Sequence, residues 1–249
     1  MIKKILFFIC FINIIIYAQE TNEVKLSRQE RAFLKASKDG KINTVRKYLN
    51  ENINIEVRDE EGNTALILAT EWEHFDIVKL LVENNANVNA RDNDLYTPLM
   101  VSAIVGNYKI SEYLIGHGAD VNMNDTTASV LFYAAGSGNY KIVELLIRNN
   151  ASVKGQYGDG ALIKSIFYKY NKIAKLLIDN GASINAKSID NFTVLMTAIY
   201  VENIEMINYL ISKGANLKIK SDDGIDALQL AKNLKNKEII AIIERAYLK

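Results

Sequence analysis

Residues 92–125 have the sequence DNDLYTPLMVSAIVGNYKISEYLIGHGADVNMND, and this stretch decides the fold of the chain. It contains a polar turn, a helix start at Thr97-Pro98-Leu99, a glycine at position 106, a second apolar helix and an exit segment, GADVN. The same outline recurs about every 33 residues along the rest of the chain. A fixed period of this length predicts a solenoid, in which each unit packs only against its neighbours.

One apolar position marks the first helix of every unit. It is occupied by Phe33, Leu66, Leu99, Leu131, Leu162, Leu195 and Leu228, which lie 31 to 33 residues apart. The second helices share an equally regular apolar pattern. These landmarks predict one repeat domain over residues 28–249, with seven units at about 28–59, 60–92, 93–125, 126–155, 156–188, 189–221 and 222–249.

Thr97-Pro98-Leu99, the exit at 118–122 and residues 131–138, LFYAAGSG, resemble the ankyrin repeat family. The resemblance covers residues 28–249 and implies an all-α solenoid of stacked helix-turn-helix units joined by β-hairpin-like turns. It also implies a protein–protein interaction scaffold. The family's histidine after the landmark leucine is replaced here by Ile67, Met100, Phe132, Ile163, Met196 and Gln229. We therefore expect the hydrogen bonds that this histidine usually makes between units to be absent or replaced by apolar packing.

Polar residues two positions before the landmark predict how the first helices begin. Thr64, Thr97, Ser129, Thr193 and Asp226 can each accept a hydrogen bond at a helix N-cap. Gly160 is the exception and predicts a looser start for unit five. Gly62, Gly158 and Gly224 lie where the turn needs a positive φ. Asn191 tolerates that geometry and Leu95 does not, so we expect the turn of unit three to deviate.

Residues 1–18 have the pattern of a secretory signal peptide. Lys3 and Lys4 precede an apolar run over 5–17, which is shorter than the ~20 residues of a membrane-spanning helix. We therefore predict export, a polar lead-in at 19–27, and a periplasmic or secreted protein that is not inserted in the membrane after cleavage. The alternative is an uncleaved N-terminal membrane anchor.

Charge and residue usage exclude several classes of function. The chain has 30 basic and 29 acidic residues, so it lacks the positive excess of nucleic-acid-binding proteins. Its heavy use of Lys, Ile and Asn suggests an AT-rich bacterial coding bias. The single cysteine, Cys10, lies in the predicted signal segment, so the mature chain has no cysteine for a disulfide or a nucleophile. Stacked apolar helices alone must stabilise it.

Two histidines, His74 and His117, are the remaining candidates for catalysis or metal binding. His74 lies beside Glu71 and Glu73 at a turn between helices, and the resemblance implies a structural role for it. His117 lies where a second helix ends, and we interpret it as a solvated cap. The acidic turns lack the spaced oxygen ligands of a calcium loop. We predict no catalytic residue, no metal and no cofactor. The alternative, a metal-dependent enzyme, would use His74 with the two glutamates.

In the ankyrin family, the two positions before the mid-repeat glycine face the concave groove and are usually polar. Here they predict an apolar stripe, interrupted only at Gly136-Ser137 and formed by Trp72, Ile104, Val105, Phe167, Tyr168, Tyr200, Val201 and Leu234. Exposed apolar patches mark partner sites, and Trp and Tyr are frequent in binding hot spots. The alternative is that these side chains pack against neighbouring helices and close the groove.

Turn tips are expected to form the rim of this groove. The predicted rim residues are Glu60, Glu61, Asn93, Asp94, Tyr96, Tyr157, Ile189, Phe192, Asp223 and Ile225. The leading hypothesis is an exported, monomeric, non-enzymatic scaffold that binds a protein partner through the concave groove. The alternatives are a periplasmic accessory protein that stabilises an envelope enzyme, or a secreted effector that binds host proteins. The fold itself does not name the partner, because one scaffold serves many targets.

Overall fold

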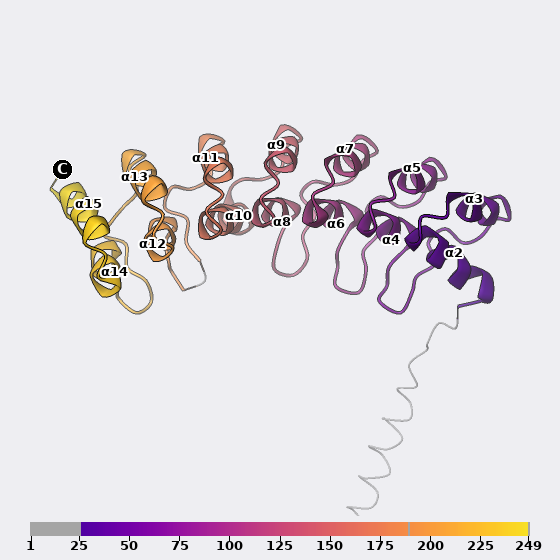
Figure 1. Cartoon of the computed structure of the whole chain (residues 1–249), viewed down its shortest axis with the longest axis horizontal. Coiled ribbons are helices and arrows are strands. Elements are labelled where there is room, and N and C mark those ends of the chain that lie inside the picture. Colours follow the sequence, from indigo (N-terminus) through magenta and orange to yellow (C-terminus); the bar gives the residue numbers. More distant parts are fainter. Residues whose placement is uncertain (1–25, 189, 249) are drawn as a thin grey trace, which may run out of the picture.

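The computed structural model describes residues 26–188 and 190–248, which form seven consecutive helix pairs. The first helices are α2 (Arg28–Lys38), α4 (Ala65–Glu71), α6 (Pro98–Val105), α8 (Val130–Gly136), α10 (Gly155–Phe167), α12 (Val194–Tyr200) and α14 (Ala227–Leu234). The second helices are α3 (Ile42–Asn50), α5 (Phe75–Glu83), α7 (Tyr108–Gly116), α9 (Tyr140–Arg148), α11 (Asn171–Asp179), α13 (Ile204–Ser212) and α15 (Lys237–Tyr247). The pairs stack into one curved row, with the first, inner helices on the concave side and the second, outer helices on the convex side (Figure 1). The predicted all-α solenoid is confirmed.

Turns project from the concave side of the row between successive units (Figure 1). Three of them are closed by antiparallel bridges, Arg58 to Thr64, Asn124 to Ser129 and Lys187 to Thr193. We call all of these turns between units, with or without a bridge, fingers. Neighbouring fingers also bond to one another, since the backbone N–H of Asn93 donates to the carbonyl of Glu61 at 3.0 Å. The N–H of Asp222 donates to the carbonyl of Asp190 in the same way, at 3.2 Å, so backbone bonds join the fingers of units two and three and those of units six and seven.

The predicted N-caps begin the inner helices as expected. The side chains of Thr64, Thr97, Ser129, Thr193 and Asp226 each accept a hydrogen bond from the backbone N–H three residues on. At the start of the row, Ser27 and Glu30 form a reciprocal capping box at distances of 2.8 and 3.2 Å. Each cap satisfies an amide that the helix itself leaves free, and this is worth about 1 kcal/mol.

The finger of unit three keeps the same shape as its neighbours, contrary to expectation. Leu95 takes the left-handed conformation, with φ 68°, and its N–H donates to the Asp92 carbonyl at 3.1 Å. The Asp92 side chain also accepts from the N–H groups of Asp94 and Tyr96, at 2.9 and 2.8 Å. These bonds outweigh the strain of a leucine at positive φ, which is of order 1–3 kcal/mol.

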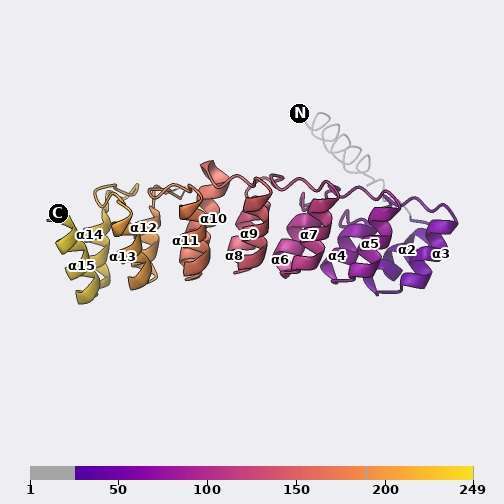
Figure 2. The ribbon, with the colours of Figure 1, turned by 90° about the horizontal axis from the view of Figure 1, so that it is seen from above.

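Unit five is where the row departs from its pattern. Helix α10 begins at Gly155 and extends past the other inner helices in place of a finger (Figure 2). Gly158 and Gly160 lie inside this helix, so the predictions of a positive φ at Gly158 and of a loose start at Gly160 are wrong. The physical reason for this departure is the short spacing between units four and five. Leu162 follows Leu131 by only 31 residues, which leaves too few to close a finger.

The core lies between the inner and outer rows. The landmark residues from Phe33 to Leu195 are 0 to 1% exposed, and Leu228 of the terminal unit is half-buried. Burying such a side chain contributes about 1.5–3 kcal/mol. Apolar packing replaces the family's histidine as expected at five positions: Ile67, Met100 and Met196 are fully buried, and Phe132 and Ile163 are half-buried. At Gln229 the side chain is exposed, and the hydrogen bond that it accepts from the N–H of Asp226 lies within its own unit.

Asparagine side chains in the exit loops join successive units. Asn89 donates to the carbonyl of Gly118 at 3.1 Å and accepts from the N–H of Asp120 at 2.9 Å. Asn122 makes the equivalent pair of bonds to the carbonyl of Asn150 and the N–H of Ser152. These polar bonds thus join the exit loops of successive units.

Removing one of these links tests their contribution to stability. We expect Asn89→Ala to lower the free energy of unfolding by about 1–2 kcal/mol, because two backbone groups lose a partner. Urea unfolding followed by circular dichroism measures the change. Asn208→Ala is the matched control, since Asn208 is exposed and bonds only within its own helix. Equal effects of the two substitutions would contradict a linking role for Asn89.

The predicted signal segment, 1–18, and most of the lead-in lie outside the described residues. No helix within the described part of the chain is long and apolar enough to cross a membrane.

Candidate functional site

The predicted apolar stripe lies at the C-terminal ends of the inner helices, on the concave side of the row (Figure 1). Six of its eight residues are exposed: Trp72 50%, Ile104 40%, Val105 38%, Phe167 45%, Tyr168 47% and Tyr200 56%. Val201 and Leu234 are half-buried. The alternative in which these side chains close the groove is therefore wrong for the six exposed residues. We call the exposed six the groove stripe.

Neighbouring side chains support the aromatic members of the groove stripe. The ammonium group of Lys38 lies 5.2 Å from the centroid of the Trp72 ring. Phe167 and Tyr168 pack edge to face, with centroids 5.3 Å apart, and Phe192 packs in the same way on Tyr200 at 6.3 Å. Such contacts hold the rings in place while leaving about half of each exposed.

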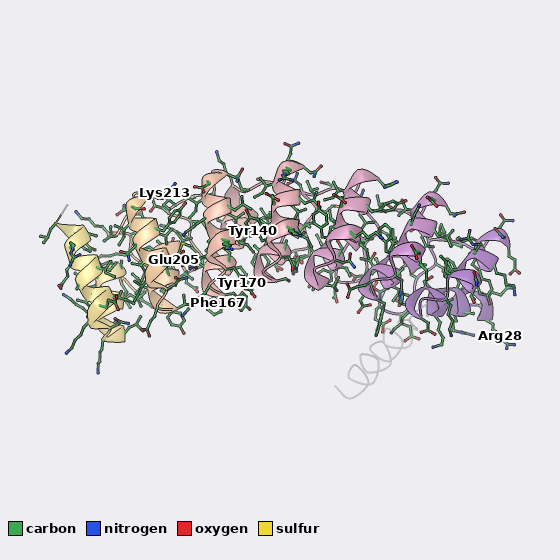
Figure 3. All side chains as sticks on the ribbon, turned by 45° about the horizontal axis from the view of Figure 1, so that its top comes forward. Arg28, Tyr140, Phe167, Tyr170, Glu205 and Lys213 are labelled. Atoms are coloured by element: carbon green, nitrogen blue, oxygen red, sulfur yellow. The ribbon has the colours of Figure 1, made fainter. Side chains whose placement is uncertain are left out.

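The small residues in the middle of the stripe are covered by unit five. The stem of Lys164 lies against Gly136, where an added Cβ would be 3.0 Å from its Cγ atom. The ring of Tyr170 lies over Gly138 in the same way, at 2.8 Å. Figure 3 shows Phe167 and Tyr170 close together at the turn between α10 and α11. Lys164 and Tyr170 were not predicted as site residues, although the glycines opposite them, Gly136 and Gly138, leave room for a neighbouring side chain.

The predicted rim is only partly formed by finger tips. Glu60, Glu61, Asn93, Asp94 and Asp223 are exposed, and Tyr96, Phe192 and Ile225 are half-buried. Ile189 lies outside the described residues. The assignment of Tyr157 to a turn tip is wrong, because it lies in the first turn of α10 and its hydroxyl bonds to the Asn124 side chain at 3.2 Å. The rim is therefore acidic at both ends and helical at unit five.

Tyr96 belongs to a hydrogen-bond network at the base of the fingers. The hydroxyl of Tyr133 donates to Asp125, and it lies 3.2 Å from the hydroxyl of Tyr96. Asp125 also accepts from the backbone N–H groups of Thr127 and Ala128. Burial alone would raise the pKa of the Asp125 carboxyl, but the bonds from Tyr133, Thr127 and Ala128 outweigh it and lower that pKa. Burial and the Asp125 carboxylate raise the pKa of Tyr133.

This network predicts a pH-dependent part of the stability. Because the folded-state pKa of Asp125 is lowered, its contribution is present above the unfolded pKa of about 3.9 and is lost as pH falls below it. We expect Asp125→Asn to cost about 1–2 kcal/mol at neutral pH and progressively less below about pH 4. Urea unfolding of both proteins across that range measures the difference. A difference that stays constant down to the lowest pH would contradict the role of the carboxylate.

The histidines occupy structural positions. The Nε2 atom of His74 lies 2.9 Å from the carbonyl of Lys38, and its ring packs on Gly40 of the preceding unit. His117 is exposed at the end of α7, where its ring stacks on Tyr113 at 4.0 Å. Within the described ranges, no group of three or more His, Cys, Asp or Glu side chains is arranged to hold a metal ion.

Comparison with known families and structures agrees with this architecture. The family model described as "Ankyrin repeats (3 copies)" matches residues 33–125 and 99–188, and the model described as "Ankyrin repeat" matches residues 190–222. Among solved structures, the chain is similar to the human ASB11 ankyrin repeat domain, with 26% identity and a TM-score of 0.72. That match covers 80% of this chain and 90% of the human domain. The comparison with curated proteins gives no match.

Proposed function

The chain belongs to the ankyrin repeat family, and from this premise we propose that it is a non-enzymatic scaffold that binds a partner protein through its concave groove. The observation that carries the proposal is the groove stripe, in which three large aromatic side chains, Trp72, Tyr168 and Tyr200, are each about half exposed. Exposed apolar surface of this kind is costly in water and is covered on binding. Trp and Tyr bring large contact area at low entropic cost, which makes them the best candidates for hot spots.

The proposed partner contacts extend from the stripe to the exposed finger tips. Glu60, Glu61, Asn93, Asp94 and Asp223 carry mostly negative charge and would form the polar rim around an apolar centre. Rim charges mainly steer association and select partners, while the buried aromatic centre contributes most of the affinity.

We further propose that the mature protein begins at about residue 19 and acts after export, as a monomer, in the periplasm or outside the cell. The basic start and apolar run of residues 1–18 support export. An uncleaved N-terminal anchor is the alternative, and a permanent partner in the envelope or a host protein would fit the same groove. Mass spectrometry of the purified protein distinguishes a cleaved chain from an anchored one.

A capture experiment tests the binding function. The chain from residue 19 is immobilised beside a variant in which Trp72, Tyr168 and Tyr200 are replaced by alanine, and both are incubated with envelope extract. A partner held by the first and lost by the second supports the groove. The matched control replaces Lys79, Arg148 and Asn208, which are exposed on the outer helices, and should keep the partner. Equal capture by all three proteins would overturn the groove as the binding site.

A further inference from the structure

Units four and five carry an unusual distribution of charge. No Asp or Glu occurs at 126–143 or at 160–178, and the second of these stretches contains Lys164, Lys169, Lys172 and Lys175. The chain as a whole is nearly neutral, with 30 basic and 29 acidic residues. The middle of the solenoid is therefore locally basic, whereas the fingers of units two and three carry a net negative charge.

Three of the four lysines are free to meet a ligand. Lys175 is paired with Glu205 at 2.6 Å. Among the described residues, Lys164, Lys169 and Lys172 take part in no ion pair. Glu205, the acidic residue next to them on α13, is already engaged by Lys175 and by the amide of Asn171. An anion that approaches this region would meet unneutralised ammonium groups.

Aromatic rings surround the ammonium group of Lys164. It lies 5.3 Å from the centroid of Phe132 and 5.2 Å from that of Tyr168. Tyr168 in turn lies 6.0 Å from Tyr170 and 5.3 Å from Phe167. Cation–π contacts orient an ammonium group but leave its N–H donors unsatisfied, so the group remains able to bind a carboxylate.

Lys169 adds a second argument, because its backbone is strained. It has φ 60° at the mid-repeat position where units one, three and four have Gly40, Gly106 and Gly138. Glu73 and Glu202 occupy the same position in units two and six, and each bonds to an asparagine of the next unit. Lys235 occupies the same position in unit seven with φ 58°. The backbone N–H of Lys169 donates to the Ile166 carbonyl at 3.0 Å, as at other helix ends. Within the described chain the Lys169 side chain takes part in no ion pair, so its charge remains available to a ligand.

We propose that the middle of the groove recognises an acidic segment of the protein partner, with carboxylates bound by Lys164 and Lys169 and apolar side chains packed on Phe167, Tyr168 and Tyr170. This proposal rests on the groove function proposed above and names the chemistry of the partner. The acidic fingers of units two and three repel such a segment and favour its binding over units four and five. A flat anionic membrane fits less well, because the fingers project from the same concave side and would meet it first (Figure 1).

Selection from a random peptide library displayed on phage tests this proposal with the full chain as the target. We expect the selected peptides to be enriched in Asp and Glu next to aromatic or aliphatic residues, and to compete with one another. Lys169→Gly should weaken their binding by about three- to fivefold, and combining it with Lys164→Gln by at least about tenfold. Lys218→Gln, on an exposed exit loop, is the matched control and should change nothing.

Lys169→Gly also separates binding from folding. It removes the charge and relieves the left-handed strain, so the variant should be at least as stable as the wild type while it binds acidic peptides less well. A variant that loses stability would show that Lys169 is structural and would count against the proposal.

The remaining outcomes distinguish this proposal from the groove function. The selected peptides could lack acidic enrichment and still fail to bind the variant without Trp72, Tyr168 and Tyr200. That result would overturn the acidic partner but would keep the groove as the binding site. Peptides that bind that variant as well as the wild type would overturn the groove itself. No selected peptide, together with lysine-dependent binding to phosphatidylserine vesicles, would replace the protein partner by a membrane.

Discussion

Replacing Trp72, Tyr168 and Tyr200 together by alanine is expected to weaken binding of the captured partner by more than about 100-fold. Each ring is about half exposed in the free protein, so a bound partner removes the remaining apolar surface from water. Single replacements of hot-spot aromatics cost about 2 kcal/mol or more, and neighbouring ones are not additive. Tyr168 and Tyr200 lie in neighbouring inner helices, so we expect the triple effect to be smaller than the product of the single effects.

Stability measurements show whether the weaker binding comes from lost contacts with the partner or from unfolding of the variant. Because the three rings are only partly buried, their removal should lower the free energy of unfolding by less than about 1 kcal/mol each. Titration calorimetry gives the affinity, and urea unfolding gives the stability of the same samples. A variant that unfolds well below the wild type would show that the rings belong to the core, and the groove would then lose its main support.

The periodicity of the sequence was enough to predict the solenoid, the helix starts outside unit five and the positions of the stripe, but not whether its side chains are exposed. Each landmark residue occupies an equivalent place in a unit, so a position near Leu99 predicts the environment of the same position near Leu195. The positions proposed to bind the partner follow from the same equivalence. The chemistry of the individual side chains then shows where this chain departs from a polar groove.

Interactions between units account for what the sequence could not predict. Lys164 covers Gly136 because the two residues come from adjacent units, and no pattern within one unit indicates that contact. Leu95 tolerates a positive φ because hydrogen bonds to Asp92 hold the turn. The steric preference of leucine alone therefore wrongly predicted that this turn would deviate. The missing finger of unit five could have been predicted from the sequence, because the 31-residue spacing before Leu162 is too short for a finger.

The second large effect is expected at Gly138, where Gly138→Val should lower the free energy of unfolding by about 3–5 kcal/mol. Two costs combine there. The backbone has φ 77°, a conformation that a β-branched residue adopts with strain, and an added Cβ would lie 2.8 Å from the Tyr170 ring. Gly214→Val is the matched control, because Gly214 has φ 85° and nothing within 4 Å of its added Cβ. It should lose only the strain, about 1–3 kcal/mol.

The Tyr170 ring accounts for the difference between these two substitutions. Adding Tyr170→Ala to Gly138→Val should therefore restore part of the lost stability, whereas adding it to Gly214→Val should not. Urea unfolding of these four variants, the single Tyr170→Ala variant and the wild type completes both double-mutant cycles. Equal losses at Gly138 and Gly214 would contradict close packing of the ring. Tyr170 covers the turn of unit four and also lies beside Tyr168 in the groove. The contact that joins units four and five thus also positions the rings that are proposed to receive the partner.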